Sequence, residues 1–340
     1  MACGCPPRIV GLALPAACAI DGLDPAAYAR HALHDPARNW PETNCYVDLL
    51  VEVLARRGHD PRAALAFTVA QDYEGDQFTF FKFPAADLAL LYGVEIQELA
   101  IFDRLEEHVG VQLARGRLPM IEVDSYHLPD TRGITYRQSH GKTTIAVNVL
   151  DSAGRRLDYF HNAGYFRLEG EDFDALMRPA RDNGLPLFPY VEFIKFGPAP
   201  PVHAQIEISR ALLAQHLRRR PSQNPFTAWG EVIGADIGRL IGRPPEWFHT
   251  YAFSTLRQAG ANFELLASYL EWLQDPALER ARLAAQAIAG GTKMMQFQFA
   301  RASARGKVPD VSEAIRQLAS DYDIALDSLT NGVIARGAAA

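Results

Sequence analysis

The chain has 340 residues, of which 48% are hydrophobic and 22% are charged, and its formal net charge is −6. This composition indicates a soluble globular protein that is long enough for two hydrophobic cores. The acidic balance argues against nucleic acid as a partner, because phosphate neutralisation needs a dense basic surface, and no apolar run approaches the ~20 residues that span a bilayer.

An apolar run, "IVGLALPAACAI", lies near the start of the chain at residues 9–20. It is short, contains Pro15 and follows the polar segment "MACGCPP", so we expect a buried strand or an irregular lead-in rather than a secretory signal. The chain has four cysteines: Cys3, Cys5, Cys18 and Cys45. Their spacing fits neither a disulfide framework nor a paired zinc site. Reduced thiols and a cytoplasmic location are therefore expected.

The first third of the chain is patterned mainly as helices. Helices are predicted over residues 25–34, 45–57, 60–67, 85–91 and 95–115. The pattern then alternates apolar and polar residues, which is typical of strands. Strands are predicted over residues 118–126, 143–151, 155–162 and 190–197. The turn signal "SAGR" between the second and third strands predicts a hairpin.

From about residue 202 the pattern is helical again. Helices are predicted over residues 203–219, 226–241, 245–258, 262–273, 276–289 and 310–332. The segment "FGPAPP" at 196–201 is a natural boundary between the two textures. The sequence thus predicts an α+β domain over residues 1–199, in which helices precede an antiparallel sheet, and an all-α domain over residues 200–340.

Cys45 stands at the predicted start of the second helix. Thr43 and Asn44 are typical N-cap residues, and Gly58 is a typical stop signal after the helix. At a first helical turn the helix dipole favours a thiolate, so the position suits a cysteine nucleophile. The alternative is that Cys45 is a small core residue, as most buried cysteines are.

A cysteine nucleophile needs a base and a group that orients the base. Papain-like folds supply them in a fixed order: Cys at a helix start, His at a strand start, then Asn or Asp on the next strand. His140 precedes the predicted strand 143–151, and Asn162 ends the next strand, so the two can meet across the hairpin. Asp158 is the rival to Asn162, and His161 is expected to lie on the opposite face as a substrate-side or exposed residue.

Four segments, "NCYVDLLVEVLARRG", "LALLYGVEIQEL", "GRLPMIEVDSYHLPD" and "SHGKTTIAVNVLDSAGRRLDYFHNAGY", resemble the N-terminal domain of the butirosin biosynthesis protein H family. That family has the papain-like fold of bacteriocin-processing cysteine peptidases. The segments "YEGDQFTFFKFP", "VDSYHLPDT" and "YFHNAGY" are more closely similar to an uncharacterised bacterial family encoded beside amino acid:carrier-protein ligases.

The resemblance implies acyl transfer from a carrier-protein thioester to a small amine. Cys45 would be the nucleophile, His140 the base and Asn162 the orienting residue. No cofactor would be bound, since the carrier protein presents its own phosphopantetheine. The chain lacks the glutamine that papain-like peptidases place ahead of the cysteine, so the backbone N–H of Cys45 with the Asn44 or Thr43 side chain is expected to form the oxyanion hole.

Other residues are candidates for substrate binding. In the loop "DYEGDQFTFFKFP", Glu74 or Asp76 could hold an ammonium group with Gln77 as a polar contact; alternatively, the loop anchors its phenylalanines in the core and its carboxylates cap the next helix. Asp124 and Tyr126 could line the same cleft, or belong to an edge turn. The scattered histidines offer no ligand set with metal spacing.

The segment "HLRRRP" at 216–221, together with Arg239 and Arg243, forms a basic patch on this acidic chain. It is either a solvated helix face or a docking site for an acidic carrier protein. Two alternatives to the transferase remain open. One is a hydrolase of the same fold, a peptidase or amidase, and the other is a non-catalytic partner of a carrier protein or ligase.

Overall fold

The computed structural model describes residues 17–178 and 188–337. Its contacts divide the chain into two compact units. Unit 1 is Met1–Ala29 with Ile96–Lys195, and unit 2 is Arg30–Glu95 with Phe196–Ala340. The sequence predicted one boundary, between residues 199 and 200. The observed division differs because residues 30–95 group with the C-terminal helices.

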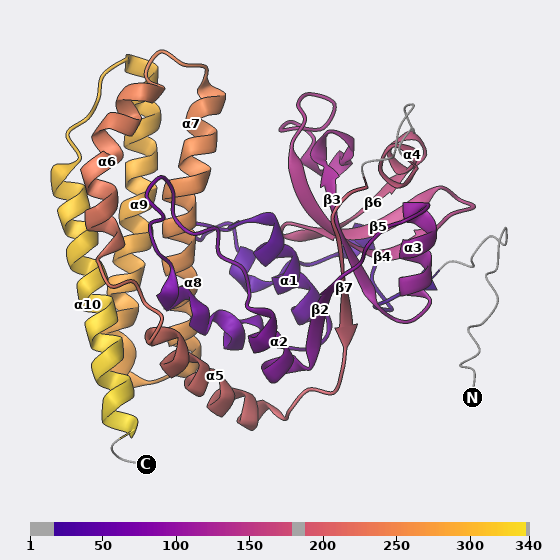
Figure 1. Ribbon diagram of the computed structural model, residues 1–340, viewed down its shortest axis with the longest axis horizontal. Helices are drawn as coiled ribbons and strands as arrows, with labels where there is room; N and C mark the ends of the chain where they lie inside the picture. Colours follow the sequence, from indigo (N-terminus) through magenta and orange to yellow (C-terminus); the bar gives the residue numbers. More distant parts are fainter. Residues whose placement is uncertain (1–16, 179–187, 338–340) are drawn as a thin grey trace. The chain divides into compact units, whose positions relative to one another are not determined.

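An antiparallel sheet forms the centre of unit 1 (Figure 1). The strands are β1 (Ala17–Cys18), β2 (Val94–Glu98), β3 (Leu118–Asp124), β4 (Lys142–Asp151), β5 (Arg156–His161), β6 (Gly164–Glu169) and β7 (Val191–Phe196). Their order is β2-β7-β3-β4-β5-β6, and β1 pairs with β4. The four predicted strands and the β4–β5 hairpin are confirmed, with Ala146 opposite Phe160.

One face of this sheet carries the hydrophobic core of unit 1. Ile121, Ile145 and Tyr159, from three neighbouring strands, are fully buried in it. Residues of α3 (Leu105–Leu113) and α4 (Glu171–Met177) complete the same core. The ends of β3, β4 and β5 therefore stand on a rigid base, which is what a site at a strand end requires.

The predicted helix over residues 95–115 is wrong in its first half. Residues 94–98 form the edge strand β2 beside β7, and the helix α3 starts only at Leu105. The Leu99 N–H donates to the Val191 carbonyl just beyond the strand. Pairing with a distant strand therefore overrides the local helical pattern.

The predicted lead-in strand at residues 9–20 lies mostly outside the described residues. Its described end is β1, and the chain just after β1 is tied to the sheet by Asn148. The Asn148 side chain accepts a hydrogen bond from Ile20 N at 2.7 Å and donates to Ile20 O at 3.0 Å and to the Tyr165 hydroxyl at 2.9 Å. These bonds satisfy the buried polar groups of an otherwise apolar layer.

Unit 2 is helical. Its helices are α1 (Cys45–Arg56), a 3₁₀ helix (Pro61–Ala70), α2 (Ala85–Tyr92), α5 (Val202–Leu217), α6 (Pro225–Leu240), α7 (Pro245–Ala252), a π-helical turn (Phe253–Arg257), α8 (Gln258–Leu273), α9 (Glu279–Arg305) and α10 (Ser312–Gly337). Helix α9 packs against both α8 and α10, and α10 against α6 (Figure 1). Within the two described ranges, no helix is both long and apolar enough to cross a membrane.

Most helix predictions hold for unit 2. Helix α1 is confirmed with Asn44 as its N-cap, and the predicted C-terminal helices are found with shifted ends. Helix α9 runs sixteen residues beyond its predicted end at 289. The predicted helix over residues 25–34 is wrong: only the 3₁₀ turns Pro25–Ala27 and Ala32–His34 form there.

A close backbone approach within unit 2 gives a stability prediction at Gly93. This glycine has φ +65°, and a Cβ there would lie 2.4 Å from the Pro198 carbonyl oxygen. We expect Gly93→Ala to lower the free energy of unfolding by roughly 2 kcal/mol or more, from left-handed strain plus the clash. The matched control is Gly58→Ala, where φ is +79° but the space is open, so only the strain applies. Equal losses in urea unfolding would show that the approach to Pro198 relaxes at no cost.

Candidate active site

Cys45 is the first residue of α1 and is half-buried. Asn44 precedes it with an extended backbone, and its side-chain oxygen accepts a hydrogen bond from Val47 N at 3.0 Å. The placement of the thiol in the first turn of a capped helix is therefore confirmed. This is the position at which the helix dipole stabilises a negative charge.

The two predicted oxyanion donors are already engaged within unit 2. The Asn44 amide donates to the Phe81 carbonyl at 3.1 Å, and the Thr43 hydroxyl donates to Asp48 at 2.7 Å. The Thr43 hydroxyl has no second hydrogen to donate. We therefore do not retain the Thr43 hydroxyl as an oxyanion donor. The Asn44 amide has a second N–H, so its role in the oxyanion hole stays a prediction.

A buried charge cluster beside the start of α1 was not predicted from the sequence. The His34 ring lies between two carboxylates of α1, with Nδ1 2.5 Å from Glu52 Oε1 and Nε2 3.3 Å from Asp48 Oδ1. Burial by itself lowers the pKa of His34, but the hydrogen bonds and charges of Asp48 and Glu52 outweigh it and raise the pKa to about 9. The sequence did contain a signal for this cluster. Asp48 and Glu52 lie four residues apart among apolar residues of the predicted helix, and buried carboxylates need a partner.

In unit 1, the ring of His140 is held by Asp124 at the end of β3. Asp124 Oδ2 lies 2.5 Å from His140 Nδ1, and its other oxygen accepts from the backbone N–H groups of Tyr126 and Gly141. Burial alone would raise the pKa of Asp124, but these hydrogen bonds and the nearby ring lower it. An ionised carboxylate on Nδ1 places the proton there and leaves Nε2 as the basic nitrogen of a neutral ring.

The His140 ring also stacks on Tyr126, with ring centroids 4.6 Å apart and planes at 14°. The side chain of His140 is 76% exposed, so its basic nitrogen is accessible from solvent. Asp124 and Tyr126, which the sequence suggested as substrate residues, thus both contact the predicted base. The geometry assigns them to positioning the ring.

Asn162 does not hold the His140 ring in the described residues. It starts the tight turn between β5 and β6, where its φ of +45° suits an asparagine. Continuing the β4–β5 register places it opposite Thr144, four residues from His140. The alternative orienting residue, Asp158, forms an ion pair instead: its two oxygens accept hydrogen bonds from the Arg167 guanidinium at 2.6 and 2.8 Å.

His161 belongs to another histidine–carboxylate pair of unit 1, and this pair is buried. Its Nδ1 lies 2.6 Å from Asp130 Oδ2 and its Nε2 2.8 Å from the Thr143 hydroxyl, while the Tyr159 hydroxyl donates to the other oxygen of Asp130. His161 is 1% exposed. Because both ring nitrogens bind protein groups, we do not retain His161 as a substrate contact.

The acidic loop of unit 2 is closed by a bridge between Tyr73 and Phe78. The tip of the loop exposes Glu74, Asp76 and Gln77. The Glu74 carboxylate accepts a hydrogen bond from the Thr79 hydroxyl at 2.5 Å. Phe78 and Phe81 are buried, as the anchoring interpretation expects, but Phe80 is exposed. The start of α2 shows no side-chain cap. A role of the three polar residues in substrate binding stays a prediction.

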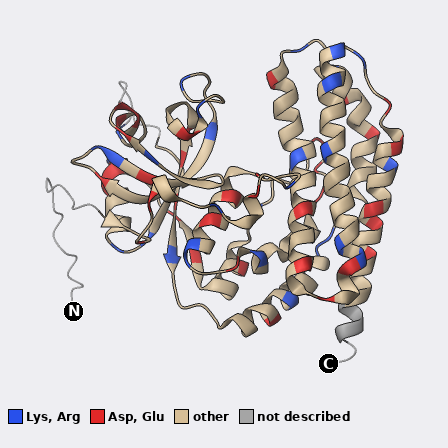
Figure 2. Ribbon diagram, turned by 180° about the vertical axis from the view of Figure 1, so that it is seen from behind, with Lys and Arg blue, Asp and Glu red and all other residues tan. Residues whose placement is uncertain are grey.

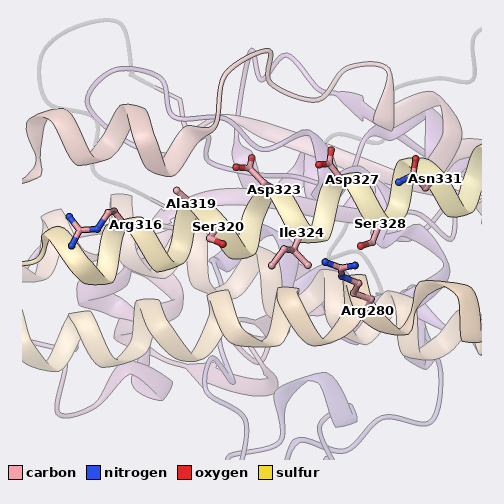
Figure 3. Close-up of a pocket in the computed structure, with 9 residues that line it drawn as sticks. All are labelled: Arg280, Arg316, Ala319, Ser320, Asp323, Ile324, Asp327, Ser328 and Asn331. Atoms are coloured by element: carbon pink, nitrogen blue, oxygen red, sulfur yellow. The ribbon is translucent and has the colours of Figure 1, made fainter.

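Two hollows of unit 2 are formed by residues other than Cys45. One of about 670 Å³ opens between α9 and α10, where Asp323 and Asp327 project from successive turns of α10 and Arg280 comes from α9 (Figure 3). Another of about 570 Å³ contains Asp76 and Arg239. Within the described residues, no group of three or more His, Cys, Asp or Glu side chains could hold a metal ion.

The predicted basic patch is not continuous. Arg218 and Arg220 follow α5, whereas Arg239 and Arg243 lie at the other end of α6. The 16 residues of α6 separate the two groups by about 24 Å at the usual helical rise. Acidic and basic residues are interspersed along the helices (Figure 2), which is the solvated-face pattern.

The geometry of the two described thiols predicts a difference in alkylation. Cys18 donates to the Ile20 carbonyl at 3.0 Å, and desolvation of its sulfur raises its pKa. Cys45 stands at a helix N-terminus, which favours the reactive thiolate. We expect iodoacetamide to label Cys45 well below pH 8 and faster than Cys18, as measured by peptide mass spectrometry. Equal rates and pH profiles at the two sites would contradict an activated Cys45.

Comparison with known proteins identifies the family of the chain. The family model of the DUF1839 N-terminal domain matches residues 29–196, and that of the DUF1839 C-terminal domain matches residues 202–331. A search of curated proteins found no match. The helical domain that the second model covers corresponds to α5–α10. Since the two models together cover most of its length, the chain belongs to the DUF1839 family.

Proposed function

We propose that this protein is a cytoplasmic thiol acyltransferase with a papain-like arrangement, which moves an aminoacyl or acyl group from a carrier-protein thioester to a small amine. The observation that carries the proposal is the position of Cys45 in the first turn of the capped helix α1. The exposed His140, oriented by Asp124, supports it as a base. Cys45 belongs to unit 2 and His140 to unit 1.

In the proposed reaction, the Cys45 thiolate attacks the thioester carbonyl of the carrier phosphopantetheine. The pantetheine thiol leaves and takes the proton that His140 removed from Cys45. An amine then attacks the Cys45 thioester and gives a proton to His140, which passes it to the leaving Cys45 sulfur, so the thiol and the neutral base are both regenerated. Exchange between thioesters is nearly isoenergetic, so positioning and stabilisation of the oxyanion are what the protein must supply.

The experiment that tests the transferase compares discharge of the acylated protein by water and by amines. After the carrier is removed, a set of small amines should clear the acyl group from Cys45 faster than buffer alone, with the amide product detected by mass spectrometry. A transferase must exclude water or lose its intermediate. Discharge at one rate whatever amine is present would make the protein a hydrolase instead.

A further inference from the structure

Two cations of unit 2, Arg257 of the π-helical turn and Lys293 of α9, each lie over an aromatic ring and are close enough to repel each other. The Lys293 ammonium lies 4.3 Å from the ring centroid of the buried Trp40, and the Arg257 guanidinium lies 5.8 Å from that of Phe253. Arg257 ends the π-helical turn, which packs against α9. Such widened turns are rare in helices and are often found at functional sites.

The charge of this pair is incompletely balanced. Burial is the main effect that lowers the pKa of Lys293, the positive charge of Arg257 adds to it, and Glu264 opposes it. Glu264 already accepts the backbone N–H groups of residues 39 and 40, and it pairs with Arg38 at 3.6 Å. Among the described residues, Arg257 and Lys293 make no ion pair within 4.0 Å. An anion held between them would relieve the repulsion and the cost of burial.

Short segments of chain connect these cations to the start of α1. The Trp40 ring, which contacts the Lys293 ammonium, belongs to the segment that leads into α1. Trp40 lies four residues before Asn44, the N-cap of α1. The ring of Phe80 lies 6.2 Å from that of Phe253, and the next residue, Phe81, accepts the Asn44 amide. The segments that contain Trp40 and Phe80 therefore link the two cations to the N-cap of α1.

We infer that Arg257 and Lys293 bind the phosphate of a phosphopantetheine arm whose thioester reaches Cys45. This inference rests on the proposed function for the identity of the arm. Arginine and lysine bind phosphate through charge-assisted hydrogen bonds, and the rings of Phe80 and Phe253 offer an apolar surface to the pantetheine chain. Both rings and both cations retain solvent access.

The test is calorimetric titration of the full chain with 4′-phosphopantetheine, pantetheine, AMP and inorganic phosphate. We expect 4′-phosphopantetheine to bind at least about tenfold more tightly than pantetheine, since one charge-assisted hydrogen bond accounts for that factor. It should also bind more tightly than AMP and inorganic phosphate, which lack the pantetheine chain. Arg257→Gln and Lys293→Met should each remove the advantage over pantetheine. Lys293→Arg, which keeps the charge, should retain it, and Arg305→Gln, an exposed arginine further along α9, should leave it unchanged.

Two results would overturn the inference: no advantage of 4′-phosphopantetheine over pantetheine, or equal binding of AMP, which would indicate a general phosphate site. Acylation of Cys45 by a loaded carrier separates this inference from the proposed function. Normal acylation of Arg257→Gln and Lys293→Met would contradict the phosphate site and leave the transferase standing. Selective binding of 4′-phosphopantetheine without acylation of the wild-type protein would support the site and contradict the transferase.

Discussion

Incubation of the protein with an aminoacyl-loaded carrier protein is expected to add the aminoacyl group to Cys45, as a mass increase of the intact chain. Cys45→Ala should abolish the adduct because it removes the nucleophile. His140→Ala should slow adduct formation by roughly 10²–10⁴-fold, the usual contribution of a positioned general base. Stopped reactions analysed by intact mass give both rates.

The same assay decides which residue orients the base. Asp124→Asn should slow acylation by about tenfold to 10⁴-fold, because an amide can offer a donor to Nδ1 and favour the wrong ring tautomer. Asn162→Gly is the comparison, since glycine keeps the left-handed backbone of that turn. It should leave the rate nearly unchanged. A loss at Asn162 with none at Asp124 would reverse the assignment, and turnover that survives Cys45→Ala would exclude the thiol mechanism.

The buried His34 cluster is expected to make the stability of the protein fall at alkaline pH. The pKa of His34 is about 9 in the folded protein, against its ordinary 6.5. The folded state therefore retains a proton that the unfolded chain loses, and the contribution is complete below about pH 6.5. It is lost as the pH rises through 9. The difference between the folded and the ordinary pKa of His34 corresponds to about 3 kcal/mol in the free energy of unfolding.

Urea unfolding between pH 6 and pH 10 measures this contribution. In His34→Gln, the decrease of the free energy of unfolding between pH 6.5 and 9 that His34 causes should disappear. At pH 6 the free energy of unfolding should be lower by about 3–5 kcal/mol, because Asp48 and Glu52 stay buried without their cation. His249→Gln is the matched control, since His249 is an exposed histidine of the same unit. A pH profile of His34→Gln that parallels the wild type would show that the ring is not charged in the folded protein. Slower alkylation of Cys45 in this variant would show that the cluster also supports the helix start.

The sequence by itself was enough for features whose causes are local. Asn44 and Gly58 bracket α1 with a cap and a stop, so the helix and the place of Cys45 in its first turn follow from neighbouring residues. The β4–β5 hairpin follows in the same way from alternation and a turn signal. The membership of residues 30–95 in unit 2 has no such local signal, because it arises from packing against distant helices.

Only the tertiary structure decided the partners of the histidines and the fate of residues 94–98. Asp124 reaches His140 because β3 pairs antiparallel with β4, which brings together residues sixteen positions apart. His34 meets Asp48 and Glu52 for the same kind of reason, since a buried charge takes its partners wherever the chain packs. Residues 94–98 form a strand because β7 offers its edge. Hydrogen bonds and ion pairs between segments far apart in the chain have no fixed spacing, so a pattern of single residues cannot specify them.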